Sequence, residues 1–101
     1  MRILIVEDEV PLRNGLLKLL REEGYAADAA ANGEEGLHKA MECDYDAIVL
    51  DYLMPVMDGR EMLRRLRHAK RTPVMMLTAR NSVDDRVAGL ALVDGGWIHL
   101  A

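Results

Sequence analysis

The stretch DAIVLD, residues 46–51, decides the fold, because a short apolar run that ends in an acid is typical of a buried strand. Two other runs have the same form. Ile3–Val6 is followed by Glu7-Asp8, and Val74–Leu77 is followed by Thr78. Near-continuous apolar strands of this kind occur in parallel sheets that helices cover on both faces. The three runs therefore predict an α/β fold with polar side chains at the ends of its strands.

Amphipathic segments separate the apolar runs, and four of them carry a start signal for a helix. These signals are Pro11 and the capping pairs Asn32 with Glu35, Asp58 with Glu61, and Ser82 with Asp85. A weaker strand is predicted at Tyr25–Ala30 and a short last strand at Trp97–Leu100. The alternation predicts βαβ units and a mainly parallel sheet of five strands. Because the sequence stops at Ala101, no fifth helix is expected.

Composition limits the classes of function. The 101 residues suit one domain, and half of them are hydrophobic, as in an ordinary globular protein. A formal net charge of -4 argues against direct nucleic-acid binding, and the basic run Arg64–Arg71 is interpreted as a solvated helix end. Cys43 is the only cysteine, so a reducing, cytoplasmic location is expected. No apolar run approaches the length of a membrane span.

The polar strand ends predict a metal-dependent phosphoacceptor site. In open parallel sheets ligands bind beyond the carboxyl ends of the strands, where Glu7, Asp8, Asp51 and Thr78 are expected. Crowded carboxylates repel one another unless a cation lies among them, and Mg²⁺ suits such a site. One carboxylate can then attack phosphorus and form an aspartyl phosphate, with Thr78 bound to a phosphoryl oxygen. An alternative stays open: the first two acids only cap the first helix, and Thr78 is an ordinary strand-end residue.

Four motifs carry a resemblance to a known family. They are ILIVEDE (Ile3–Glu9), IVLDYLMPVMDG (Ile48–Gly59), TPVMMLTAR (Thr72–Arg80) and DRVAGL (Asp85–Leu90). In this order and spacing they resemble the receiver domains of two-component response regulators, especially those of winged-helix transcription factors. The resemblance covers residues 1–92 of a single domain spanning 1–101, with an atypical tail at 93–101. It implies a doubly wound, flavodoxin-like parallel sheet of strand order 2-1-3-4-5.

The resemblance also implies a role for each site residue. Asp51 is the phosphoacceptor, served by a sensor histidine kinase. The Mg²⁺ ligands are Glu7, Asp8, Asp51 and the carbonyl of Leu53, while Thr78 is the switch hydroxyl and Trp97 falls at the switch aromatic. Such a domain catalyses its own phosphorylation without being a conventional enzyme, and it acts in the regulation of transcription.

The tail departs from the family pattern. Leu100 falls where the family has a lysine, and an apolar side chain can neither offset charge on the phosphoryl group nor sense it. The other lysines belong to helices or lie just after them, so none is expected to replace it. A degenerate receiver that binds partners without effective switching is therefore the alternative function. The missing last helix also predicts an incompletely covered sheet face, and hence a homodimer or higher assembly.

A third hypothesis is a phosphatase of the haloacid-dehalogenase kind, which also uses a strand-end aspartate and Mg²⁺. Such an enzyme needs a second acid two residues after the nucleophile to protonate the leaving group. Leu53 occupies that position, so the sequence disfavours this hypothesis.

Overall fold

The computed structural model describes residues 1–51, 54 and 56–77, in which strands and helices alternate. The elements are β1 (Arg2–Val6), α1 (Val10–Glu22), β2 (Ala26–Ala30), α2 (Gly33–Glu42), β3 (Ala47–Asp51), α3 (Gly59–Arg67) and β4 (Val74–Leu77). The predicted alternation is confirmed over this part of the chain. The predicted fourth helix and the predicted last strand at Trp97–Leu100 lie outside the described residues.

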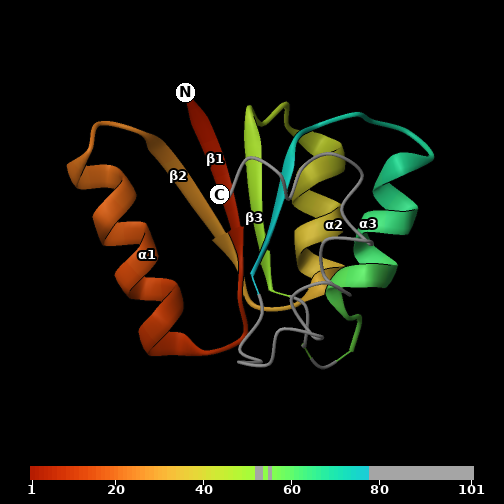
Figure 1. The fold of residues 1–101 in the computed structure, drawn as a ribbon, viewed down its shortest axis with the longest axis horizontal. Coiled ribbons are helices and arrows are strands. Elements are labelled where there is room, and N and C mark those ends of the chain that lie inside the picture. The colour runs from red at the N-terminus through yellow and green to blue at the C-terminus, as the bar shows by residue number, and fades with distance from the viewer. Residues whose placement is uncertain (52–53, 55, 78–101) are drawn as a thin grey trace.

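The four strands form one parallel sheet in the order β2-β1-β3-β4 (Figure 1). This is the order predicted for the first four strands. Helix α1 lies on one face of the sheet, and α2 and α3 lie on the other. The chain passes from β1 outward to β2 and then returns to place β3 on the opposite side of β1. Strand order therefore reverses between β1 and β3, which is where ligands bind in open α/β sheets.

The sheet face toward α2 and α3 holds the main core. Alternate strand residues point to this face and are almost completely buried, with exposed fractions of 0 or 1%. They are Leu4, Val6, Ile48, Leu50, Val74 and Met76. Met62, Leu63 and Leu66 of α3 pack against them. These three residues form the apolar face of α3.

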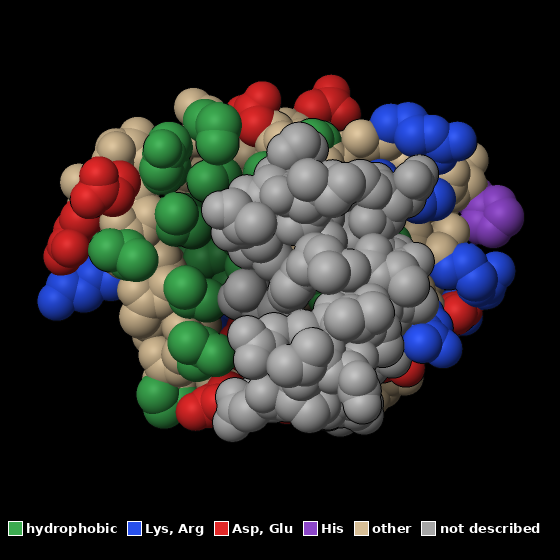
Figure 2. All heavy atoms as spheres, viewed as in Figure 1, with side chains coloured by type: hydrophobic (Ala, Val, Ile, Leu, Met, Phe, Trp, Pro, Cys, Tyr) green, Lys and Arg blue, Asp and Glu red, His purple; other side chains and the backbone are tan. Residues whose placement is uncertain are grey.

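Among the described residues, those on the opposite face are less completely buried. Helix α1 has no fully buried residue, and Val49 and Met75, which point to its side of the sheet, are only half-buried. Two large apolar residues of this helix, Leu12 and Leu19, are 43% and 54% exposed. Figure 2 shows apolar side chains gathered in a column beside α1. The side chains on the two faces of the sheet thus differ in how completely they are buried.

The predicted caps of α2 and α3 are confirmed. The side-chain oxygen of Asn32 accepts a hydrogen bond from the backbone N–H of Glu35 at 2.8 Å, and the Glu35 carboxylate accepts one from the N–H of Ala31 at 3.0 Å. Asp58 accepts a hydrogen bond from the N–H of Glu61 at 2.9 Å. These bonds satisfy backbone donors in the first turn of each helix and fix where the helices begin.

Two glycines let α2 approach its neighbours closely. A Cβ atom added to Gly36 would lie 2.7 Å from a methyl group of Val6 in β1. One added to Gly33 would collide with the backbone carbonyl of Met57. The first turn of α2 therefore packs directly on the loop that leads from β3 to α3.

The basic run at the end of α3 is largely exposed, as interpreted from the sequence, and several of its side chains also bind the protein. Arg67 donates to the carbonyl of Thr72 at 2.8 Å, and Arg71 donates to the carbonyl of Arg67 at 2.5 Å. Two further arginines, Arg64 and Arg65, both pair with Glu61. Figure 2 shows Lys and Arg side chains on this side of the molecule. Their contacts hold the last turn of α3 and the segment that follows it.

Lys70 belongs to the same run and caps a different helix. Its ammonium group donates to the carbonyls of Ala40 and Cys43, at 2.8 and 3.0 Å, and to the carboxylate of Asp44. The carbonyl oxygens at the end of a helix have no partner within the helix and carry partial negative charge. Lys70 thus joins the end of α3 to the end of α2.

The Lys70→Met variant should lose about 1 to 2 kcal/mol of unfolding free energy, because the bound carbonyls at the end of α2 lose a charged donor. Chemical denaturation at neutral pH measures this loss. Lys18→Met is the matched control, since Lys18 is 79% exposed and makes only a 4.0 Å ion pair with Glu22. Equal stability of the two variants would contradict the capping role.

Candidate metal and phosphoacceptor site

Three acids meet at the carboxyl edge of the sheet, between β1 and β3. The register pairs Val6 with Leu50, so one further step along each strand places Glu7 opposite Asp51. Asp8 is the next residue in the loop. Carboxylate oxygens from the three acids lie within 4.8 Å of one another. The topology thus brings together the acids that the sequence singled out.

The cluster is crowded and largely withdrawn from water. Glu7 is 5% exposed and Asp51 is 9% exposed, whereas Asp8 is exposed. Burial, together with the neighbouring carboxyl groups of Asp51 and Asp8, raises the pKa of Glu7 from its ordinary value of 4.5 to about 8. Three carboxylates at this spacing cannot all ionise without a compensating charge. The donor set fits a small, hard cation such as Mg²⁺.

The loop between β1 and α1 is held in place by Arg13. Its guanidinium group donates to the backbone carbonyl of Glu7 at 3.0 Å and lies 3.5 Å from that of Asp8. The backbone N–H of Glu7 continues the sheet and donates to the carbonyl of Ala30 at 3.1 Å. Sequence reasoning missed Arg13. The only feature of the sequence that could have indicated this contact is the position of Arg13, about one and a half helical turns after the two acids.

The alternative in which these acids merely cap α1 is not supported. The N-cap residue of α1 is Glu9, and its side chain makes no capping hydrogen bond. The one contact of Glu7 with this helix start is a long one, with its carboxylate 3.4 Å from the N–H of Glu9. The acidic cluster is therefore better explained by its own chemistry.

Each of the three lysines of the chain has partners away from the cluster. Lys18 faces Glu22, and Lys70 caps α2. Lys39 donates to the carbonyl of Ala29 at 2.5 Å and pairs with Glu35 at 3.3 Å. The sequence contains no further lysine.

Some residues that the sequence analysis singled out lie outside the described residues. They are Leu53, Thr78 and Trp97, which have predicted roles, and Leu100, which departs from the family pattern. The predictions made for them stay predictions.

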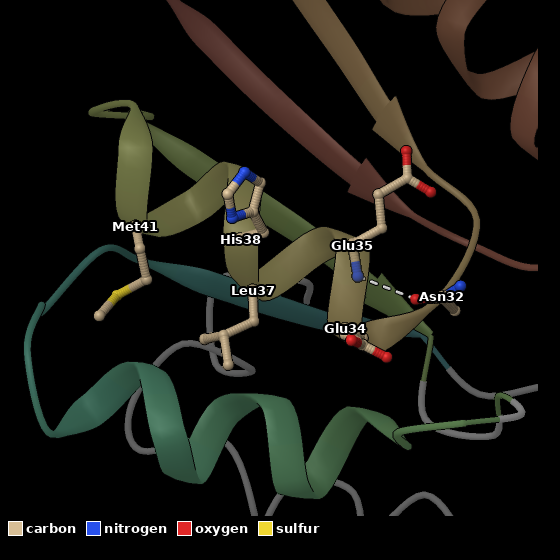
Figure 3. Close-up of a pocket in the computed structure, with 6 residues that line it drawn as sticks. All are labelled: Asn32, Glu34, Glu35, Leu37, His38 and Met41. Atoms are coloured by element: carbon tan, nitrogen blue, oxygen red, sulfur yellow. Dashed lines mark hydrogen bonds between the residues drawn. The ribbon is translucent and has the colours of Figure 1, made fainter.

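An open hollow of about 590 Å³ runs along α2 (Figure 3). Its lining residues are Asn32, Glu34, Glu35, Leu37, His38 and Met41. Two of them are engaged in the cap of this helix, and the imidazole of His38 lies 3.7 Å from the carboxylate of Glu42. None of the three clustered acids, Glu7, Asp8 and Asp51, lines this hollow.

The pH dependence of stability should reveal the Glu7 carboxyl group. A pKa that is higher in the folded state means that the folded protein binds the proton more tightly. Without metal, the unfolding free energy should then fall as pH rises from 4.5 toward 8, by about 1 to 3 kcal/mol. Mg²⁺ competes with this proton, so its affinity should rise over the same range.

Denaturation curves of the metal-free protein between pH 5 and pH 8.5 test this expectation. The Glu7→Gln variant keeps the shape of the side chain and cannot ionise, so the fall should be absent from its profile. Parallel profiles for the two proteins would contradict the assignment of the titration to Glu7.

A doubly wound parallel sheet with an acidic cluster at its point of strand reversal defines an α/β protein of the flavodoxin-like class. The family described as "Response regulator receiver domain" matches residues 3–96. The chain belongs to this family.

Curated relatives support this assignment. The chain is 49% identical over 90 residues to the transcriptional regulatory protein HprR of Escherichia coli strain K12, an alignment covering 89% of this chain and 40% of HprR. It is 52% identical over 92 residues to the transcriptional activator protein IrlR of Burkholderia pseudomallei, covering 91% of this chain and 40% of IrlR. The chain thus spans 40% of the length of these two relatives.

Solved structures show the same fold. The receiver domain of the Francisella response regulator 1452 superimposes with a TM-score of 0.85 at 29% identity, over 93% of this chain and 78% of that one. The response regulator TrrA of Thermotoga maritima, in complex with Mg²⁺ and BeF, gives a TM-score of 0.76 at 37% identity. That match covers 92% of this chain and 81% of TrrA.

Proposed function

We propose that Asp51 accepts a phosphoryl group from a sensor histidine kinase, as the signal-receiving step of a two-component system. The observation that carries the proposal is the gathering of Glu7, Asp8 and Asp51 within 4.8 Å at the strand-reversal point of a receiver fold. A carboxylate oxygen of Asp51 forms the new bond to phosphorus. The bond from phosphorus to the kinase imidazole breaks, and its electron pair leaves with the imidazole.

Glu7, Asp8 and Asp51 would hold Mg²⁺, with the backbone carbonyl of Leu53 as a further ligand. When bound, Mg²⁺ offsets negative charge on the incoming phosphoryl oxygens. Glu7 would bind the cation in its ionised form, because a cation offsets the burial and the neighbouring carboxyl groups that raise the pKa of Glu7. TrrA, a family member with a solved structure, contains Mg²⁺ and BeF.

The proposal extends to two switch residues. Thr78 would hydrogen-bond a phosphoryl oxygen, and Trp97 would take up a new position in response. The output would be the regulation of transcription, since HprR and IrlR are transcriptional regulators.

Intact-mass measurement after incubation with acetyl phosphate tests phosphoryl acceptance. A phosphoryl adduct should form in Mg²⁺ and be absent in EDTA, with circular dichroism confirming the fold in both. A folded protein that gains no adduct in Mg²⁺ would exclude the active receiver and favour the alternative function, a degenerate receiver that binds partners without switching. The engagement of all three lysines elsewhere is the observation that favours this alternative.

We also propose that the chain forms a homodimer or higher assembly through the face that α1 leaves incompletely covered. Support comes from the exposed leucines Leu12 and Leu19 and from the half-buried Val49 and Met75 on that face. Light scattering across a concentration series tests it. A mass that stays at that of one chain at all concentrations would refute the assembly.

A cytoplasmic location, where a receiver would meet the kinase domain that phosphorylates it, belongs to the same proposal. Within the described ranges, no helix combines the length and the apolar character needed to cross a membrane.

A further inference from the structure

Strand β2 forms one edge of the sheet, and alternate residues of this strand point away from it. The N–H of Ala26 donates to Met1 and the carbonyl of Ala30 accepts from Glu7, so these residues face β1. In a parallel strand the N–H and C=O of one residue point to the same side, and successive residues alternate. The backbone groups of Ala27 and Ala29 are therefore directed outward, where another strand could pair with them.

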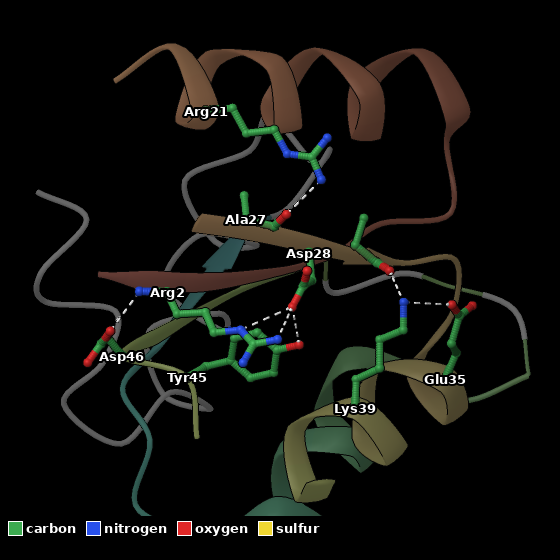
Figure 4. Close-up of polar contacts among 9 residues, drawn as sticks. Arg2, Arg21, Ala27, Asp28, Glu35, Lys39, Tyr45 and Asp46 are labelled. Atoms are coloured by element: carbon green, nitrogen blue, oxygen red, sulfur yellow. Dashed lines mark hydrogen bonds and ion pairs between the residues drawn. The ribbon is translucent and has the colours of Figure 1, made fainter. Parts of the chain in front are cut away.

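Cationic side chains occupy both outward carbonyls. Arg21 of α1 donates to the carbonyl of Ala27 at 2.8 Å, and Lys39 of α2 donates to the carbonyl of Ala29 at 2.5 Å (Figure 4). The two helices lie on opposite faces of the sheet, so the edge is closed from both sides. Lys39 is held in this position by its ion pair with Glu35.

The side chains of β2 provide little obstruction of their own. The strand reads Ala-Ala-Asp-Ala-Ala, and small side chains leave the backbone open to a second strand. Its one charged residue, Asp28, is turned to internal partners. It accepts hydrogen bonds from Arg2 at 3.0 Å and from the Tyr45 hydroxyl at 2.7 Å. Blocking of the edge thus depends on side chains that come from the two helices.

We propose that Arg21 and Lys39 close the β2 edge against strand addition by a second copy of this chain. Natural sheets protect open edges with charged side chains, because unpaired backbone groups act as templates for association. Here the charges bind the acceptor groups that an added strand would need. Any assembly of the native chain must then use another surface, so this inference does not depend on the proposed phosphoryl transfer.

The test compares association of the native chain with that of the Arg21→Met, Lys39→Met double variant by sedimentation velocity over a concentration series. Methionine keeps an unbranched stem and removes the donor. The concentration of half-association should fall at least about tenfold, since two outward acceptors become available for intermolecular hydrogen bonds. The amide protons of Ala27 and Ala29 should exchange more slowly in the associated state.

A charge-matched control is Lys18→Met with Arg64→Met, which removes two cations whose contacts lie away from β2. Adding Ala29→Pro to the test variant should restore native behaviour, because proline removes an outward N–H and leaves the ladder with β1 intact. Association equal to that of the control, or association that Ala29→Pro does not reverse, would overturn the proposal. Each single methionine variant gives the same comparison if the double variant does not fold.

Discussion

The Asp51→Asn variant should gain no phosphoryl group from acetyl phosphate in Mg²⁺, while the native chain is labelled. An amide is a far weaker nucleophile than a carboxylate, and the substitution also removes one of the three charges that favour the cation. Asparagine has nearly the shape of aspartate, so the buried strand end can keep its packing. Intact mass gives the labelled fraction directly.

Stability distinguishes loss of chemistry from loss of fold. Removing one carboxylate from the crowded cluster relieves repulsion between the acids. The unfolding free energy of Asp51→Asn should therefore equal that of the metal-free native chain or exceed it by up to about 1 kcal/mol. Asp44→Asn is the control, because the Asp44 side chain is 99% exposed and precedes β3, whereas Asp51 lies at the opposite end of this strand. Labelling that survives in Asp51→Asn would mean that another acid accepts the phosphoryl group.

The Gly33→Ala variant should lose about 1 to 3 kcal/mol of unfolding free energy, because its methyl group has no space beside the backbone of Met57. A backbone carbonyl cannot turn away as a flexible side chain can. Either α2 or the loop after β3 must therefore move. Denaturation curves measure the loss.

Gly15→Ala is a demanding control for that result. Gly15 lies inside α1, and a Cβ added there meets nothing within 4 Å. Alanine is the better helix former, so this variant should gain about 0.5 to 1 kcal/mol. Opposite signs for the same chemical change are expected. Equal effects would mean that helix propensity alone governs both sites.

The sequence predicted the features that depend on local pattern. The run at 46–51 identified β3 and its terminal acid, and the polar residues Asn32 and Asp58 identified two helix starts, because apolar periodicity and capping signals are written within a few residues. Topology then placed Glu7 beside Asp51, since parallel strands end at the same edge of the sheet.

Other features could not be predicted because they depend on contacts between distant residues. Lys70 contacts the carbonyl of Ala40, thirty positions earlier, and Arg13 reaches back to the backbone of Glu7. The sequence around a lysine or an arginine is the same whether its side chain is solvated or bound to a distant carbonyl. The exposure of Leu19 likewise depends on how much of α1 packs against the sheet. The spacing of apolar residues along the helix does not reveal that extent.

The contacts of the three lysines also affect how readily each of them reacts with acetyl phosphate. Acetyl phosphate can transfer its acyl group as well as its phosphoryl group, and an amine reacts only through a free lone pair. The side chains of Lys39 and Lys70 are bound to backbone carbonyls and are 37% and 23% exposed, whereas that of Lys18 is 79% exposed. Among the lysines, acetylation should therefore fall on Lys18 first, and this side product will be recognisable because it persists when Asp51 is replaced.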